Sequence, residues 1–380
     1  SSPRGRVVHS VMRTAFAPVS AGFGAPARRH APKPNRPTGL SMQCRNRILF
    51  HEKEVQRGAD GIVSVKLSAG DPRSTHARDV LKISPGDTLR VGILNDSPAT
   101  AVVMACPSQA YPCAELFLTW RPGEESGDAD TARRNLVLGG QKNGAAPNRE
   151  PAVPSLDQHR HTHVQIDLLI AVPRPKVLRR LWAPLASLGV GRVFLTNASR
   201  VEKSFWDASS LGTETVERNL IKGLEQAGDV FVPGVTLVKR FPAVLDAIGV
   251  SGETPKPESV TVLVTSGIHD GDASAKSKNQ NQNANFTTQT SEQQPIMLVA
   301  HPGSCVSLRS ALRGAGKDSW GYGPKRVVIA VGPEGGWSEF ELETLKKGGF
   351  TAIEIGNRTF ATDVACISLI AAVKERTETW

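Results

Sequence analysis

The sequence predicts an α/β fold in which helices cover a mainly parallel sheet, preceded by a small β-barrel. Three observations lead to this prediction. Residues 46–120 contain short apolar runs typical of strands, residues from 163 onward alternate apolar runs with helical periodicity, and a polar stretch at 121–162 separates the two regions. Strands that alternate with helices imply a parallel sheet with both faces covered.

In the first region, residues 62–67 and 88–94 have the apolar spacing of strands. A short helix is expected at 76–81, followed by a turn at 84–87 with Pro85 at its second position. We interpret residues 46–120 as a β-barrel. Residues 121–162 gather Gly, Pro and charged side chains and are interpreted as a linker or insertion.

The second region, 163–380, is interpreted as one domain. Its predicted strands are 164–172, 192–196, 230–238, 296–300, 326–331 and 351–355. Its predicted helices are 175–188, 213–226, 242–248, one that starts after Ser338, and 363–376. Residues 251–295 are mostly polar and include an Asn- and Gln-rich tract at 276–283, which predicts a disordered insertion at about 268–294.

The formal charge of +10 is concentrated at the N-terminus. Nine of the 46 Lys and Arg residues lie in residues 1–51, which contain no acidic residue, so the remainder carries 37 basic against 36 acidic residues. Bulk charge therefore does not indicate a nucleic-acid partner, and an RNA-binding face would be a local patch. An acid-free leader rich in Arg, Ala and Ser is typical of a transit peptide. We interpret residues 1–45 as a disordered transit peptide for a plastid or mitochondrion; the alternative is a basic tail that contacts RNA.

Other features limit the possible partners. No apolar run reaches 18 residues, so we expect no membrane partner. The five cysteines include no C-x-x-C pair, so neither a disulfide framework nor a zinc site is expected. His159, His161 and His163 alternate but have no Cys or carboxylate partners nearby in the sequence. A solvated loop therefore explains them better than a metal site, and we expect no metal.

Ligands of parallel sheets bind outside the carboxyl ends of the strands, which directs attention to the loops after residues 300, 331 and 355. In the second loop Gly332, Gly335 and Gly336 permit close backbone approach, and a proline stiffens the turn. Ser338 followed by Glu341 predicts a capping box on the next helix. This loop predicts a rigid backbone cradle for a ligand, with an ordinary tight turn as the alternative.

The third loop places a glycine and charged residues before the last helix. Thr362 is the expected N-cap of that helix, and Asp363 either stabilises the helix N-terminus or acts in catalysis. Arg358 stays protonated, so it could orient a phosphate or stabilise a developing anion. Residues 364–373 are apolar nearly all round, which is typical of a helix buried in a core or against a second subunit.

Together these residues resemble the RsmE family of knotted (SPOUT) methyltransferases. The resemblance lies in Gly-Pro-Glu-Gly-Gly at 332–336, Gly349-Phe350 after the next helix, and Ile355-Gly356-x-Arg358. Upstream segments fall in the family's order: 71–76 with 86–87, 173–176, 188–190, 200–204, and 225–226 with 232–233. The resemblance covers about residues 46–120 and 163–376.

The resemblance implies an enzyme that uses S-adenosylmethionine to methylate N3 of a uridine in small-subunit (16S-type) ribosomal RNA, either free or in the assembling subunit. It also implies a PUA-like RNA-binding barrel, a trefoil-knot domain and a homodimer. By position, it implies that the cofactor contacts His301, Pro302, Gly303, Gly332, Pro333, Glu334, Gly335, Gly336, Ile355, Gly356 and Arg358. It implies RNA contacts for Arg200 and Lys203.

The sequence also departs from the family. Many members have Leu-Arg-Thr-Glu where this chain has Phe360-Ala361-Thr362-Asp363. We expect Arg358 to stabilise the uracil anion and Asp363 to be the leading candidate for the base. The alternatives are a knotted methyltransferase acting on another base or a ribose hydroxyl, and a catalytically weak rRNA-binding assembly factor. Trp206 could stack on a base, although packing is the commoner role of tryptophan.

Overall fold

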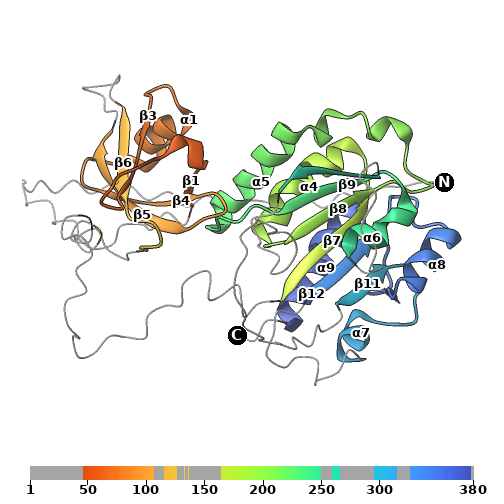
Figure 1. Cartoon of the computed structure of the whole chain (residues 1–380). Helices are drawn as coiled ribbons and strands as arrows, with labels where there is room; N and C mark the ends of the chain where they lie inside the picture. The colour runs from red at the N-terminus through yellow and green to blue at the C-terminus, as the bar shows by residue number, and fades with distance from the viewer. Residues whose placement is uncertain are drawn as a thin grey trace, which may run out of the picture. The chain divides into compact units, whose positions relative to one another are not determined.

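The computed structural model describes residues 46–106, 115–125, 132, 136, 164–249, 259–265, 295–314 and 326–377. These residues form two separate β-sheets, one from the N-terminal part and one from the C-terminal part of the chain (Figure 1). Each sheet has its own cluster of buried apolar side chains. The mixed α/β class predicted from the sequence is confirmed.

The N-terminal sheet has six strands in the order β1-β4-β5-β6-β3-β2. They are β1 (Ile48–Phe50), β2 (Gln56–Arg57), β3 (Val63–Leu67), β4 (Thr88–Ile93), β5 (Pro98–Ala105) and β6 (Leu116–Trp120). All neighbours are antiparallel except β1 and β4. Within the described residues the pairings run from β1 to β2 without closing, so the predicted barrel is seen as a six-stranded sheet.

The predicted helix at 76–81 starts earlier than expected. Helix α1 (Pro72–His76) leads directly into a π-helical turn, η2 (Ala77–Leu81). The early start has a local cause, because Asp71 accepts a hydrogen bond from the backbone N–H of Arg73 at 2.8 Å and Pro72 occupies the first turn. An Asp cap and a proline in that position both favour helix initiation.

The C-terminal sheet has seven strands in the order β10-β9-β8-β7-β12-β11-β13, and only β10 is antiparallel to its neighbour. They are β7 (Gln165–Ala171), β8 (Arg192–Thr196), β9 (Gly234–Val238), β10 (Val260–Val264), β11 (Ile296–Ala300), β12 (Arg326–Val331) and β13 (Thr351–Ile353). The central strands β7, β8 and β12 are almost entirely buried, as expected when helices cover both faces.

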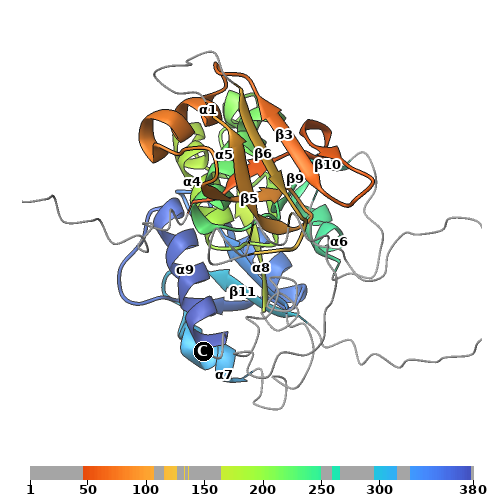
Figure 2. The same ribbon diagram turned by 90° about the vertical axis from the view of Figure 1, so that its left-hand side faces the viewer.

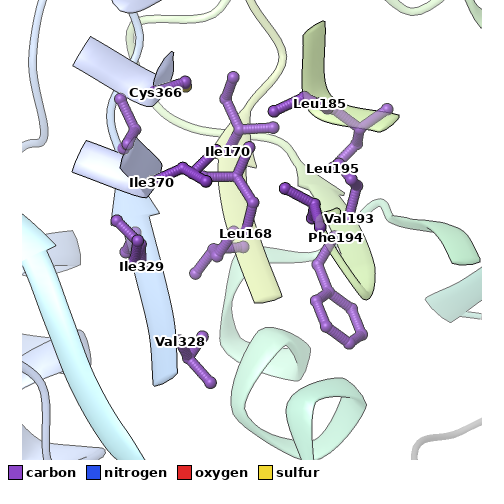
Figure 3. Packing of buried hydrophobic residues seen from close by; sticks show 14 of the residues in the cluster. Leu168, Ile170, Leu185, Val193, Phe194, Leu195, Val328, Ile329, Cys366 and Ile370 are labelled. Atoms are coloured by element: carbon purple, nitrogen blue, oxygen red, sulfur yellow. The ribbon is translucent and has the colours of Figure 1, made fainter. Parts of the chain in front are cut away.

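The helices around this sheet are α4 (Pro175–Ser187), α5 (Thr213–Ala227), α6 (Val244–Ile248), α7 (Leu308–Gly314), α8 (Glu339–Lys347) and α9 (Thr362–Thr377). Helices α5 and α9 both pack against α4 (Figure 2). The end of α8 approaches α6, where Gly348 lies against Leu245. Figure 3 shows Leu185 of α4 and Cys366 of α9 on one side of the strands, whereas the ring of Phe194 points away from them.

The C-terminal region also differs from the sequence prediction in several elements, and β13 ends at Ile353 instead of residue 355. Strand β9 starts at Gly234 instead of residue 230, because the Asp229 carboxylate accepts hydrogen bonds from the N–H groups of residues 230 and 231, at 2.7 and 3.2 Å, and Pro233 has no N–H to donate. Strand β10 and helix α7 were not predicted. Strand β10 lies within the polar stretch 251–295, outside the insertion predicted at about 268–294.

Several sequence predictions concern residues outside the described ranges. These are the leader at 1–45, most of the linker at 121–162, the insertion at 268–294, and the segment with three alternating histidines. Among the helices that the structure describes, none is long and apolar enough to cross a membrane.

Candidate active site

The three loops singled out from the sequence meet at one edge of the C-terminal sheet. Strands β12, β11 and β13 are neighbours and run parallel, so their carboxyl ends lie side by side. The loops that follow them start at His301, Gly332 and Glu354. The order along the chain differs from the order in the sheet, because β11 lies between β12 and β13.

The loop after β12 is held in a tight turn. The N–H of Gly336 donates to the carbonyl of Pro333 at 2.8 Å, and Gly336 has a φ of +74°, which favours glycine. Gly332 lies directly over the buried ring of Trp337, and a Cβ at that position would be 3.2 Å from the indole nitrogen. The missing side chain at Gly332 therefore lets the backbone of this loop pack closely on Trp337, while Gly335 is exposed.

The predicted capping box after this loop is confirmed. Ser338 accepts a hydrogen bond from the N–H of Glu341, whose carboxylate accepts from the N–H of Ser338 at 2.8 Å. The other oxygen of that buried carboxylate accepts from the N–H of Ser199 at 2.6 Å. Glu341 therefore fixes the start of α8 and also anchors the segment after β8, a role that sequence analysis missed.

The loop after β11 is bound to the neighbouring strand β13. The N–H of His301 donates to the carbonyl of Ile353 at 3.0 Å, and the hydroxyl of Ser304 donates to the carbonyl of Ala352 at 2.7 Å. Pro302 and Gly303 are exposed, and Gly303 has a φ of +80°. These two hydrogen bonds hold this loop next to the loop after β13.

The loop after β13 is tied to the second loop through the start of α9. The Thr362 hydroxyl donates to the carbonyl of Gly332 at 3.5 Å. The prediction that Thr362 is the N-cap is wrong, because α9 begins at Thr362 and the carbonyl of Ala361 accepts from the N–H of Ala365 at 2.8 Å. Gly356 has a φ of +128° and, like Arg358, is exposed. Among the described residues Arg358 has no hydrogen-bond or ion-pair partner.

The Asp363 side chain lies in the first turn of α9 and is one-fifth exposed. One oxygen accepts from the N–H of Val364 at 3.1 Å, and the other forms an ion pair with Arg180 of α4 at 2.9 Å. The sequence did not indicate Arg180, which is 183 residues away. A base at Asp363 would therefore act while paired with a guanidinium.

Cys366 lies one turn after Asp363 but is not a candidate nucleophile. Its side chain is fully buried, and burial, with a further contribution from the Asp363 carboxylate, raises the pKa of the Cys366 thiol. A thiol with a raised pKa stays protonated at neutral pH, and the thiolate is the reactive form.

The two predicted RNA contacts lie after β8. Arg200 donates to the carbonyl of Gly335, and its aliphatic carbons lie against the same glycine, where a Cβ would be 3.0 Å from Cδ. Arg200 thus contacts the glycine-rich loop itself. Lys203 is exposed at the start of the short 3-10 helix η3 (Lys203–Phe205). The backbone N–H of Arg174 donates to Glu334 at 3.2 Å, which further fixes the loop.

No metal centre is seen in the described part of the chain, where no three His, Cys, Asp or Glu side chains form a group able to hold an ion. The three loops offer a set of backbone donors and acceptors, and the paired carboxylate of Asp363 lies nearby together with three arginines, Arg180, Arg200 and Arg358. Such a site can hold a polar organic ligand and can accept a proton.

Comparison with known proteins gives one family. A family model described as RNA methyltransferase domain matches residues 160–261 and 274–374, more than half of the chain. Ribosomal RNA small subunit methyltransferase E of Treponema pallidum (strain Nichols) is 25% identical over 336 residues, which cover 88% of this chain and 92% of that protein.

Solved structures similar to this chain include two with a cofactor. Ribosomal RNA small subunit methyltransferase E from Neisseria gonorrhoeae, bound to S-adenosyl methionine, has a TM-score of 0.49 and 16% identity, and the match covers 87% of this chain and 97% of that one. A protein from Legionella pneumophila in complex with bound SAM has a TM-score of 0.47 and 17% identity, with the same coverage of both chains.

Proposed function

This chain belongs to the RsmE-type family of RNA methyltransferases, and we propose that it methylates N3 of a uridine in small-subunit ribosomal RNA with S-adenosylmethionine as the donor. The observation that carries the proposal is the meeting of the three loops after β11, β12 and β13. The relative from Treponema pallidum, which is named as acting on small-subunit ribosomal RNA, supports the choice of substrate because it matches nearly the whole chain.

The site fits the proposed cofactor. Gly332 packs so closely on Trp337 that a side chain has no room there, and Gly336 adopts a φ that suits glycine, so the loop backbone is bare at both positions. The backbone groups of the three loops can bind the adenosyl and amino-acid parts of the cofactor. The residues proposed to hold it are those implied by the resemblance: His301, Pro302, Gly303, Gly332, Pro333, Glu334, Gly335, Gly336, Ile355, Gly356 and Arg358. When bound, S-adenosylmethionine supplies a methyl group on a positively charged sulfur, which already activates the leaving group.

The protein's own task is to prepare the acceptor. The N3–H group of uracil is a weak acid, so its proton must be removed before or during methyl transfer. Asp363 is the proposed proton acceptor, at the N-terminal end of α9 next to the glycine-rich loop. Arg358, which has no partner among the described residues, is proposed to stabilise the resulting anion. Holding the uracil ring in line with the methyl group of the donor accounts for much of the acceleration of methyl transfer.

Two substitutions test these roles. Asp363→Asn should lower methyl transfer to unmethylated small-subunit RNA by at least about 100-fold, the usual contribution of a general base, and Arg358→Ala should lower it by about 100- to 1,000-fold, the usual contribution of a group that stabilises a developing anion. Binding of S-adenosylmethionine, measured by calorimetry, should remain for Asp363→Asn. Glu339→Gln, in the first turn of α8, is the matched control. Wild-type turnover in both variants would show that these residues are not catalytic.

We propose that the six-stranded N-terminal sheet is PUA-like and contacts RNA. The C-terminal segment is proposed to be threaded as a trefoil knot; in support, β13 lies at the far edge of the sheet while α9 returns to β12 and α4. A plastid or mitochondrial location is proposed on the acid-free leader alone.

A homodimer is also proposed, and the surface of α9 supports it. Val364 and Ile367 are 46% and 37% exposed although they are apolar, and Phe360, just before the helix, is 39% exposed. Large exposed apolar side chains that gather next to a site mark interaction surfaces. We propose that a second copy of the chain covers these exposed apolar side chains.

A further inference from the structure

A hollow of about 600 Å³ lies at the carboxyl ends of β8 and β9, and no residue of the three loops contributes to its lining. Asn197 and Lys239 line it, and they directly follow β8 and β9. Its volume is in the range of about 300–1,000 Å³ that is typical of sites for small organic groups. The hollow is thus at the same edge of the sheet as the candidate active site but over different strands.

One wall of the hollow is the ring of Trp206. The ring is half-buried and packs against the sheet core, while its indole N–H donates to the Oδ1 atom of Asn197 at 3.2 Å. Leu211 and Leu237, both buried, complete the apolar part of the lining. The tryptophan is therefore held in one orientation beside an apolar floor, which suits a flat aromatic ligand.

The polar lining suits a nucleotide. Lys239 is exposed and, among the described residues, its ammonium group forms no ion pair, so it is available to a phosphate. Asn197 keeps its amide N–H donors for the edge of a base. Asp207 adds a carboxylate, which can accept a hydrogen bond from a ribose hydroxyl or an amino group. Stacking on aromatic rings next to basic residues is how proteins bind single-stranded RNA.

A short segment joins the hollow to the glycine-rich loop. It follows Asn197 and contains Ser199, whose N–H donates to Glu341, and Arg200, which donates to the carbonyl of Gly335. An RNA strand whose target base lies at the three loops could therefore place a neighbouring nucleotide in the hollow.

We infer that this hollow binds one nucleotide of the RNA substrate beside the methylated residue, with its base stacked on Trp206 and a phosphate on Lys239. The choice of RNA as the ligand rests on the proposed function. The proposal adds a subsite on strands β8 and β9, separate from the loops that hold the donor.

The test uses the full chain and a fluorescein-labelled oligouridylate of ten nucleotides, with affinity measured by fluorescence anisotropy. Trp206→Ala should weaken binding by about 5- to 150-fold, since stacking on an aromatic side chain contributes about 1–3 kcal/mol per base. Trp206→Phe, which keeps an aromatic face, should restore most of that affinity and shows that the loss does not come from misfolding.

Lys239→Ala should make the negative slope of log affinity against log salt less steep by about 0.7, the value for one phosphate contact to a single strand. Lys347→Ala, at the exposed end of α8, is the matched control and should leave the slope unchanged. The inference is wrong if the unmodified chain does not bind the oligonucleotide, or if Trp206→Ala binds it with unchanged affinity.

Parallel calorimetry with S-adenosylmethionine separates this inference from the proposed function. Trp206→Ala should bind the donor normally; weakened donor binding with unchanged oligonucleotide binding would place the donor in the hollow and overturn the inference. If the unmodified chain binds the oligonucleotide through Trp206 but does not bind the donor, the inferred nucleotide site is supported and the proposed function is wrong.

Discussion

Glu341 is the residue that links the parts of the candidate site. Its side chain is buried, yet it stays satisfied because its two oxygens accept from the N–H groups of Ser338 and Ser199. These two groups belong to segments that follow β12 and β8. One carboxylate therefore sets the position of the glycine-rich loop relative to the segment that carries Arg200.

Glu341→Gln should lower the free energy of unfolding by about 1–3 kcal/mol, because an amide offers one acceptor oxygen and turns its NH₂ donor toward a buried N–H. Urea unfolding at neutral pH measures this change. Glu343→Gln, on the exposed side of the same helix, should change stability by less than about 0.5 kcal/mol. Equal stability of the two variants would show that Glu341 does not have this structural role.

Contacts between residues close together in the sequence could be predicted, whereas contacts between distant residues could not. Ser338 and Glu341 are three residues apart, so the capping box is visible in the sequence. The pair between Arg180 and Asp363 and the contact of Arg200 with Gly335 join residues that are 183 and 135 apart. Such contacts depend on how the sheet orders its strands, which no local pattern contains.

At the element scale, the buried parallel strands were the easiest to predict. Strands β8, β11 and β12 have the bounds expected from the sequence, because strands covered on both faces are continuous apolar runs. Strand β10 has half-exposed side chains at the edge of the sheet and lies within a polar stretch, which concealed it. Strand β9 was predicted too long because the Asp229 carboxylate accepts hydrogen bonds from the N–H groups of residues 230 and 231, which would otherwise pair with a neighbouring strand.

Helix α9 was predicted to be apolar nearly all round, and the structure separates its two sides. Cys366, Leu369 and Ile370 are buried against the sheet, whereas Val364 and Ile367 are exposed. A single chain therefore accounts for only part of the apolar surface of this helix.

The double substitution Val364→Glu with Ile367→Glu should convert a dimer into monomers, because like charges would face each other across the interface. Sedimentation velocity measures the change in mass. Val80→Glu, at a similarly exposed apolar side chain of the N-terminal region, is the control and should leave the dimer intact. A variant of α9 that remains dimeric would contradict the proposed interface.

At the scale of the whole molecule, the sequence predicted two structural regions and the edge of the sheet where the loops meet. It did not predict the hollow beside β8 and β9, because that surface combines residues from two loops and an unpredicted edge strand. The candidate site itself was found because glycines and charged residues follow successive strands. The hydrogen bonds and the ion pair that Glu341, Arg180 and Arg200 make in this site could be seen only in the three-dimensional structure.

We propose that this chain methylates N3 of uridine in small-subunit ribosomal RNA. The most direct measurement incubates the purified protein with unmethylated small-subunit RNA, free or in particles, and S-adenosylmethionine carrying a labelled methyl group. The RNA is then digested to nucleosides and analysed by mass spectrometry. We predict that the label appears in N3-methyluridine. Label in a different nucleoside, or no label in RNA while the donor is bound, would contradict the claim.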